Sequence, residues 1–216
     1  MSKDALLLIG GGGHAVVVAE AALAAGLALA GFLDDDDRAP LGRDLAGRVE
    51  RLGGLSMFDR PDLVGEHPVI LAVGDLPLRR RLLEGHAFKA GAVVHPSAVV
   101  SASARIGAGV FIGPGAVVHA QATVADHAII NTGAVVEHHC RVGVNTHLAP
   151  NATLGGEARV GDDCLIGLGA SVLPGVRLGD RCTVGAGSAV IREVPAGAAV
   201  AGVPALEITG HGTPGA

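Results

Sequence analysis

The sequence predicts an α/β domain of the half-Rossmann type over residues 1–90, then a left-handed parallel β-helix over residues 91–194 and a tail over 195–216. Three observations predict this combination: a six-residue repeat in the second half, a glycine run after an apolar stretch near the start, and an unusual composition. Hydrophobic residues make up 49% of the 216 residues, aromatic residues only 2%, and there are 34 glycines. A core almost without rings is filled by small and medium aliphatic side chains, which suits a narrow, repetitive interior.

The six-residue repeat runs from Val94 to Val190, and every sixth residue in this stretch is aliphatic. The residue four positions after each is nearly always small, as at Ala98, Cys140 and Ser188. A period of six matches neither an α-helix nor a flat strand, but it fits short strands joined by corners, with three hexads, about 18 residues, in each coil. Successive coils would pair at the usual strand spacing of about 4.8 Å, a register that independent strands would not keep.

The first 90 residues alternate between apolar stretches and helical ones. We expect strands at Ala5–Ile9, Leu27–Leu33 and Val69–Val73, and helices at Ala15–Ala25 and near Pro77–Leu83. These elements make up half of a doubly wound nucleotide-binding domain, which is suited to one nucleotide. A dehydrogenase would need the second half and a catalytic domain, which a β-helix does not supply.

The glycine run has the G-x-G-x-x-A form of a dinucleotide fingerprint at Gly10, Gly12 and Ala15, with Asp34 and Asp35 about 20 residues further on. Backbone amides at the start of the helix would face an anion, and an acidic side chain after the second strand would reach a ribose hydroxyl. The alternative is a tight strand-to-helix turn with no ligand.

Histidine is the usual general base near neutral pH, and the predicted β-helix holds six: His95, His119, His127, His138, His139 and His147. Residues one coil apart stack on the same face, which puts His138 beside Gly156. A missing side chain at Gly156 lets a ligand approach the backbone amide, so a base would stand beside an open hydrogen-bond donor. Two other histidines stack beside glutamates, which favours structural ion pairs: His139 beside Glu157, and His119 beside Glu137.

Cysteine usage favours structure over chemistry, because Cys140, Cys164 and Cys182 all occupy the small inward position of the repeat. Cys164 and Cys182 are one coil apart, within disulfide range by distance, but parallel Cβ directions and a cytoplasmic setting favour two packed thiols. No pair of Cys or His residues has the spacing of zinc ligands, so we expect no metal.

Composition also limits the partners. A net charge of −5 without an extended run of Lys or Arg disfavours nucleic acid. No apolar run reaches the roughly 18 residues that span a membrane, and the N-terminus lacks the layout of a signal peptide. We therefore expect a cytoplasmic protein.

The repeat resembles the hexapeptide-repeat acyltransferases. The fuller arrangement resembles the bacterial group that includes sialic acid O-acetyltransferases and nucleotide-4-amino-sugar N-acetyltransferases, and the matching stretches are residues 9–14, 31–35, 136–140 and 200–205. The resemblance implies acetyl-CoA-dependent N-acetylation of the amino group of a nucleotide-linked 4-amino-4,6-dideoxy sugar. Acetyl-CoA is the expected co-substrate, and the nucleotide sugar is the expected partner.

Matching positions imply individual roles. His138 matches the catalytic base and Asn131 an active-site asparagine, whereas His139 stands where these relatives have Glu, so the group that orients the base is open between Glu137 and another subunit. The implied contacts to acetyl-CoA are His147, Gly156, Leu168, Ala186, Gly202 and Pro204. The implied contacts to the nucleotide sugar are Gly12, Gly13, His14, Asp34 and Asp35.

Three other functions stay open: O-acetylation of a sialic acid, a sugar-nucleotide-binding scaffold without turnover, and a carbonic-anhydrase-like β-helix with three zinc-binding histidines. A filled prism has flat faces and no deep cavity, so we expect a homotrimer with grooves for CoA between subunits. The stacked polar column of His127, Asn145 and Asp163 is expected to be solvated or to face a neighbouring subunit.

Overall fold

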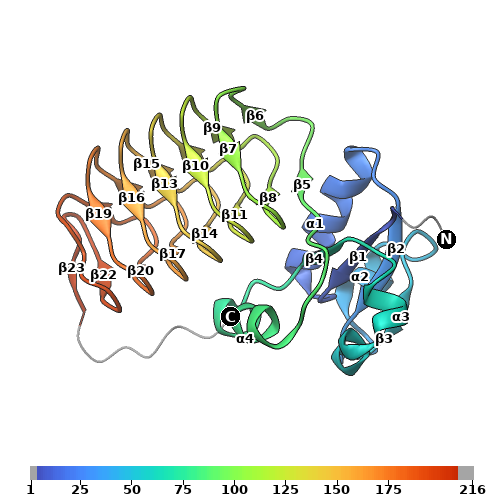
Figure 1. The fold of residues 1–216 in the computed structure, drawn as a ribbon. Coiled ribbons are helices and arrows are strands. Elements are labelled where there is room, and N and C mark those ends of the chain that lie inside the picture. Colours follow the sequence, from blue (N-terminus) through green and yellow to red (C-terminus); the bar gives the residue numbers. More distant parts are fainter. Residues whose placement is uncertain (1–3, 209–216) are drawn as a thin grey trace. The chain divides into compact units, whose positions relative to one another are not determined.

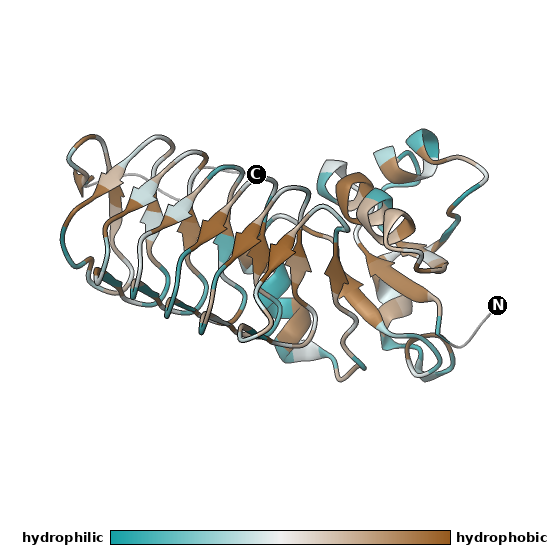
Figure 2. Ribbon diagram, turned by 90° about the horizontal axis from the view of Figure 1, so that it is seen from above, coloured by the Kyte–Doolittle hydropathy of each residue, from teal (hydrophilic) through white to brown (hydrophobic). Residues whose placement is uncertain are grey.

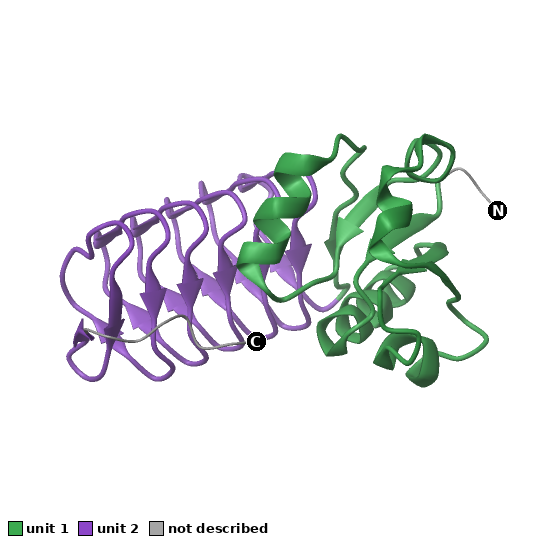
Figure 3. Ribbon diagram, turned by 90° about the horizontal axis from the view of Figure 1, so that it is seen from below, with its two compact units in different colours: residues 1–96 green, residues 97–216 purple. Residues whose placement is uncertain are grey.

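The computed structural model of the protein describes residues 4–208 and divides into two compact units, residues 1–96 and residues 97–216 (Figure 3). The end of the expected tail, residues 209–216, lies outside the described residues. No helix within residues 4–208 is long and apolar enough to cross a membrane.

Unit 1 is built on a parallel four-stranded sheet of order β3-β2-β1-β4 (Figure 1). Its strands are β1 (Leu6–Ile9), β2 (Leu29–Leu33), β3 (Arg51–Gly53) and β4 (Val69–Leu71). Every residue of β1 is buried, as expected of a parallel strand covered on both faces. The sheet is correspondingly brown, or apolar, in Figure 2. The three predicted strands are confirmed with slightly shorter bounds, and β3 was not predicted.

The helices of unit 1 are α1 (Gly13–Ala24), α2 (Pro40–Asp44), η1 (Leu55–Asp59, a 3-10 helix), α3 (Pro61–Val64) and α4 (Leu76–Gly85). Helix α1 begins two residues earlier than predicted. Helix α4 begins after Asp75, whose side chain accepts a hydrogen bond of 2.7 Å from the backbone of Leu78. The short elements α2, η1 and α3 were not predicted, because four or five residues carry no helical period.

Unit 2 is a β-helix in which the strands from β6 to β18 have two residues each and pair with the strand three places on, as when β12 pairs Val136 with Leu154 of β15. The ladders run β7-β10-β13-β16-β19, then β6-β9-β12-β15-β18-β21, then β8-β11-β14-β17-β20-β22-β23. The strands are β6 (Val99–Val100), β7 (Arg105–Ile106), β8 (Phe111–Ile112), β9 (Val117–Val118), β10 (Thr123–Val124), β11 (Ile129–Ile130), β12 (Val135–Val136), β13 (Arg141–Val142), β14 (His147–Leu148), β15 (Thr153–Leu154), β16 (Arg159–Val160), β17 (Leu165–Ile166), β18 (Ser171–Val172), β19 (Arg177–Leu178), β20 (Thr183–Val184), β21 (Ala189–Val190), β22 (Ala199–Ala201) and β23 (Leu206–Glu207).

The corners from residue 109 to residue 187 each hold one residue with a positive φ, three positions after the inward aliphatic residue. These residues are Gly109, Gly115, Gln121, His127, Gly133, His139, Asn145, Asn151, Glu157, Asp163, Gly169, Gly175, Arg181 and Gly187. Glycine, asparagine, aspartate and histidine tolerate the left-handed region better than other residues, which accounts for much of the composition at this position. His139 is one of these turn residues, with φ of 60°.

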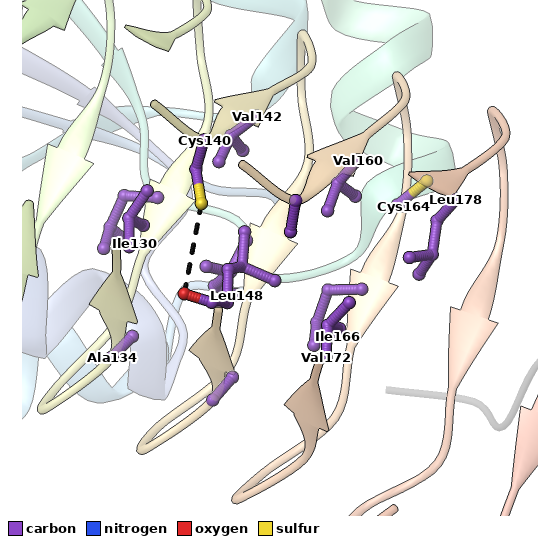
Figure 4. Packing of buried hydrophobic residues seen from close by; sticks show 14 of the residues in the cluster. Ile130, Ala134, Cys140, Val142, Leu148, Val160, Cys164, Ile166, Val172 and Leu178 are labelled. Carbon is purple, nitrogen blue, oxygen red and sulfur yellow. Dashed lines mark hydrogen bonds between the residues drawn. The ribbon is translucent and has the colours of Figure 1, made fainter. Parts of the chain in front are cut away.

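The interior of unit 2 is the aliphatic column together with the small residues (Figure 4). The predicted start of the column is wrong: Val94, in β5 (Val93–Val94) of unit 1, is 39% exposed, and Val93 is buried in its place. Alternate residues of a strand face opposite sides, so a shift of one position exchanges the two. Val100 and Ile106 pack against the core but are only partly buried.

The three cysteines are free and buried, as predicted for packed thiols. Each thiol donates a hydrogen bond to a backbone carbonyl oxygen of the neighbouring coil: Cys140 to Gly155 (3.1 Å), Cys164 to Gly179 (3.1 Å) and Cys182 to Pro195 (3.0 Å). Burial raises the pKa of the Cys140 thiol to about 11, which keeps this sulfur protonated and unreactive.

The last coil is two residues shorter than the others, because Thr183 pairs with Ala199 and Val184 with Val200. The six-residue period therefore stops after Val190, but the sheet does not. Strand β22 extends it past position 194, where the sequence placed the start of the tail, and β23 pairs with β22 in the antiparallel direction. This final strand covers the edge of the parallel ladder, which would otherwise expose unpaired backbone groups.

Candidate active site

His138 and Gly156 lie at the same corner of successive coils, as the repeat arithmetic predicted. The backbone N–H of Glu157 donates to the carbonyl oxygen of His138 at 2.9 Å, which joins the two turns. A Cβ atom added at Gly156 would lie 2.7 Å from both Cε1 and Nε2 of His138. The imidazole therefore covers the α-carbon of Gly156, and the absence of a side chain there is what makes room for it.

The backbone N–H of Gly156 has no hydrogen-bond partner among residues 4–208, and the same is true of Leu168 and Ala186. All three hold the first position of a corner turn, two residues after an inward aliphatic residue. Leu168 is 60% exposed, so its corner is open to solvent. The donors of Leu168 and Ala186 lie one coil apart at one corner, whereas that of Gly156 lies at the corner of His138, so a ligand can be held at either corner.

The His138 ring contacts the ring of its neighbour. Its Nδ1 atom lies 3.1 Å from Nδ1 of His139, and the two rings meet edge to face with centroids 5.3 Å apart. Glu137 does not reach the ring, because its carboxylate accepts from the backbone N–H of His138 (3.2 Å) and lies 3.6 Å from Nε2 of His119. The predicted His119–Glu137 pair is confirmed. The predicted pair between His139 and Glu157 is wrong, because within the described part of the chain His139 contacts His138 instead.

Asn131 and His147 form a second group. The backbone N–H of Thr132 donates to Oδ1 of Asn131 at 2.8 Å, which leaves the amide nitrogen to donate to Nε2 of His147 at 3.1 Å. Asn131 follows β11 and His147 lies in β14, whereas His138 follows β12. A single prism therefore carries the predicted site residues at two different corners.

The predicted polar column is only partly solvated, because His127 and Asp163 are half-buried and Asn145 is buried. Asn145 is fully buried and donates from its amide nitrogen to Asp163 at 2.8 Å. A Cβ atom at Gly109 would lie 2.2 Å from Nδ1 of His127, so that ring covers the glycine in the coil before it. The expectation of a solvated or subunit-facing column is wrong for Asn145, because a side chain of this length bonds along the column and is enclosed by its own chain.

The residues of unit 1 predicted to bind the nucleotide sugar are of two kinds. Gly12 and Gly13 have free space around their backbone, whereas the carboxylates of Asp34 and Asp35 already accept backbone hydrogen bonds. Gly12 precedes α1 with no side chain capping the helix, and a Cβ atom at Gly12 or Gly13 would meet nothing within 4 Å. Asp34 accepts from the backbone N–H groups of Gly11 (2.6 Å) and Asp36 (2.8 Å). Asp35 likewise accepts from the backbone of Leu55 at 2.8 Å, at the start of η1. Both carboxylates shape the strand ends, and each keeps lone pairs for a ligand.

His14, in the first turn of α1, lies against the end of β4, since a Cβ atom at Gly74 would be 4.0 Å from the Cβ atom of His14. Burial, and secondarily the charge of Arg79, lower the pKa of His14 to about 4. Arg79 itself is 1% exposed and donates to the carbonyl oxygens of Leu71 (2.5 Å) and Val73 (3.2 Å). The imidazole is therefore neutral near pH 7.

Arg79 is the residue of this region that the sequence did not single out. It stands in the run Arg79-Arg80-Arg81, and nothing in the single sequence separates the buried member from its neighbours. Unit 1 also has a cavity of about 1030 Å³ beside β2 and α2. None of the five predicted nucleotide-sugar contacts lines it. Within residues 4–208, no group of three or more His, Cys, Asp or Glu is placed to hold a metal ion.

Fold and corner chemistry together define an acyltransferase of the hexapeptide-repeat type, and comparisons with known proteins agree. Residues 5–85 match the PglD N-terminal domain, and residues 157–192 match the hexapeptide repeat of succinyl-transferase. No curated protein matches the chain.

Solved structures are similar over almost the whole chain. PerB from Caulobacter crescentus, in complex with CoA and GDP-perosamine, is 38% identical over 94% of this chain and 97% of its own, with a TM-score of 0.85. A histidine-to-asparagine variant of perosamine N-acetyltransferase from the same bacterium is 40% identical over 95% and 97%, with a TM-score of 0.87. The acetyltransferase domain of PglB from Neisseria gonorrhoeae FA1090, in complex with acetyl coenzyme A, is 34% identical over 94% and 98%, with a TM-score of 0.83. The chain belongs to the hexapeptide-repeat acyltransferase family, in the group that contains perosamine N-acetyltransferase and the acetyltransferase domain of PglB.

Proposed function

We propose that the protein transfers the acetyl group of acetyl-CoA to the amino group of a nucleotide-linked 4-amino-4,6-dideoxy sugar. The observation that carries this proposal is the imidazole of His138 against the α-carbon of Gly156, whose backbone N–H has no partner among residues 4–208. A base and an oxyanion donor at one point are what aminolysis of a thioester requires. The proposal is supported by relatives whose structures hold CoA with GDP-perosamine, or acetyl coenzyme A.

In the reaction, the sugar nitrogen attacks the thioester carbonyl carbon while Nε2 of His138 takes one proton from the amine. The carbonyl oxygen gains negative charge in the tetrahedral intermediate, and the N–H of Gly156 donates a hydrogen bond to it. The carbon–sulfur bond then breaks, and the CoA sulfur leaves with the proton that His138 returns. The products are the N-acetyl sugar and CoA, and His138 regains its free nitrogen.

The remaining candidates hold the two substrates. The N–H groups at Gly12 and Gly13 would face a phosphate, His14 would contact the sugar, and Asp34 and Asp35 would accept from the nucleoside. CoA would run from the Asn131–His147 pair along the open donors of Leu168 and Ala186 to Gly202 and Pro204. Backbone bonds fix that far end: the N–H of Gly202 donates to Ser188 Oγ at 3.0 Å, and the N–H of Ala205 donates to Ala189 O at 2.8 Å.

We also propose that the active protein is a homotrimer with each site shared between two copies. His138 stands at one corner of the prism and the Asn131–His147 pair at another. Two prisms side by side bring unlike corners together, and a threefold axis closes the ring with three equal grooves. Three free thiols and two metabolite substrates favour the cytoplasm as the location.

The test of function is release of the CoA thiol from acetyl-CoA in the presence of UDP-, GDP- and TDP-linked 4-amino sugars, with free and CMP-linked sialic acids as the O-acetyl acceptors. We expect turnover with an amino sugar, and a loss of about 10²–10⁴-fold in kcat for His138→Ala with CoA binding retained. Turnover only with a sialic acid would favour the O-acetyltransferase, and binding without turnover the scaffold. A near-normal kcat in His138→Ala would show that His138 is not the general base.

The shared site has its own test. Sedimentation equilibrium should give a mass near three times the 21.4 kDa of the chain. His138→Ala and His147→Ala subunits, each inactive alone, are unfolded together and refolded as an equal mixture. A site between two copies is intact when one supplies His138 and its neighbour supplies His147, so about a quarter of the sites should recover. No recovery in confirmed mixed trimers would place both residues in one site of one chain.

A further inference from the structure

We propose that His139 is the positioning residue for the base: a neutral imidazole that accepts the Nδ1–H of His138 and so turns the bare Nε2 toward Gly156. This inference rests on the proposed function of His138. It assigns the orienting role to a side chain of the same turn, where the sequence left the choice between Glu137 and another subunit.

The contact between the two rings fixes the tautomers. Nδ1 of His138 lies 3.1 Å from Nδ1 of His139, and one proton must lie between two nitrogens that close. Nε2 of His138 can serve as a base only if it is bare, which puts the proton of a neutral His138 on Nδ1. His139 then accepts at Nδ1 and carries its own proton on Nε2.

The backbone holds His139 in this place. Its φ of 60° is that of the left-handed corner residue, and its N–H donates to the carbonyl oxygen of Ala120 at 3.0 Å. An L residue in this conformation directs its side chain differently from the residue before it, which lets two successive rings meet edge to face.

The charged groups around the pair do not replace this contact. Glu137 is held by the backbone of His138 and by the ring of His119, which is 3.6 Å from its carboxylate. Glu157 follows in the next coil, and its backbone N–H rather than its carboxylate meets His138. Within residues 4–208 no carboxylate contacts the His138 ring.

This arrangement changes how the reaction responds to acid. When His138 takes the proton of the amine, its Nδ1–H remains donated to a neutral ring, so no new charge is needed beside it. A proton on Nδ1 of His139 would remove the acceptor and set a cation against the base. Both rings must therefore be uncharged in the free enzyme, and activity falls with two protons rather than one.

The test compares His139→Leu and His139→Glu with the wild type, using kcat/KM for acetyl-CoA across pH. We expect His139→Leu to lose about 10–100-fold in kcat, by analogy with the loss of a group that orients a metal-binding histidine. His139→Glu should restore most of that loss, because a carboxylate also accepts an N–H, and its acid limb should move to higher pH. At low pH, the slope of log kcat/KM against pH should be smaller by one in both variants than in the wild type. The sugar amine adds the same slope to all three profiles and does not affect this difference. His119→Gln is the matched control and should keep the wild-type slope.

A second measurement separates this inference from the function. Ring ¹⁵N shifts of the full protein should show His138 protonated at Nδ1 and bare at Nε2, and the opposite tautomer would overturn the inference whatever the reaction is. If no sugar supports turnover, the proposed function fails while the tautomer result still decides this point. If the wild type turns over, His138→Ala does not, and His139→Leu keeps the wild-type rate and slope, only the positioning role of His139 is refuted.

Discussion

Replacing Gly156 by alanine isolates the contact between the base and the oxyanion donor. The new methyl group would lie 2.7 Å from Cε1 and Nε2 of His138, whereas unstrained carbon contacts are about 3.5–4.0 Å. The imidazole must therefore move by about 1 Å, and a misplacement of that size in a catalytic group lowers a rate by about 10²-fold, or about 2.7 kcal/mol. Alanine keeps the backbone N–H, so the donor itself stays.

The assay is thiol release at saturating acetyl-CoA, with stability followed by urea unfolding. We expect kcat to fall about 10²-fold while the unfolding midpoint changes little, since the exposed ring can turn away. The double variant Gly156→Ala with His138→Ala is the control. If the methyl group acts only through the ring, it adds no loss to His138→Ala alone. Full additivity, or a Gly156→Ala enzyme with wild-type kcat, would refute the reasoning.

Two further predictions concern unit 1. Asp34→Ala leaves the N–H groups of Gly11 and Asp36 without their charged acceptor, which should lower the unfolding free energy by about 2 kcal/mol. The same change should raise KM for the nucleotide sugar but not KM for acetyl-CoA. The exposed Asp37→Ala should do neither, and equal effects of Asp34→Ala on both KM values would argue against separate sites. His14 has its pKa lowered from 6.5 to about 4, so below pH 6.5 the unfolded chain takes up a proton that the folded chain does not, and stability falls as pH drops toward 4. The unfolding free energy of His14→Gln relative to wild type should therefore rise by about 3 kcal/mol between pH 7 and pH 4, and a difference independent of pH would contradict a buried neutral His14.

The fold was largely predictable because its rule is local. An aliphatic residue at every sixth position, with a small residue four further on, needs no long-range information, and the coils follow from it. The prediction was wrong at the two ends of the β-helix, where the six-residue period breaks down. Val94 precedes the prism, and the last coil is two residues short, so Val194 and Val200 hold inward positions that the series does not reach.

The site was predictable only where coil spacing decides position. One coil of separation brings His138 to Gly156, and the structure has that contact. The same arithmetic gave His139 the wrong partner, because a corner residue with positive φ does not direct its ring along the column. Arg79 was out of reach for another reason: its burial depends on how α4 packs against the end of β4, which sequence periodicity does not express.

The repeat also limits where chemistry can be placed in such a chain. Of the six positions in a hexad, one is filled by the aliphatic residue, one by the small inward residue, and one by the left-handed turn residue. The position two after the aliphatic residue meets none of these demands, and at Ala108, Val144 and Asp162 its N–H donates to an aspartate side chain one coil on. This position is occupied by the proposed base, His138, and by Gly156, Leu168 and Ala186. The base, the oxyanion donor and the open amides proposed for CoA therefore share one position of the hexad. Residue type alone does not mark a functional corner, because Asp126, Asp162 and Asp180 at this position accept from the backbone of the preceding coil. The signal is instead an N–H without a partner among residues 4–208, as at Gly156, Leu168 and Ala186.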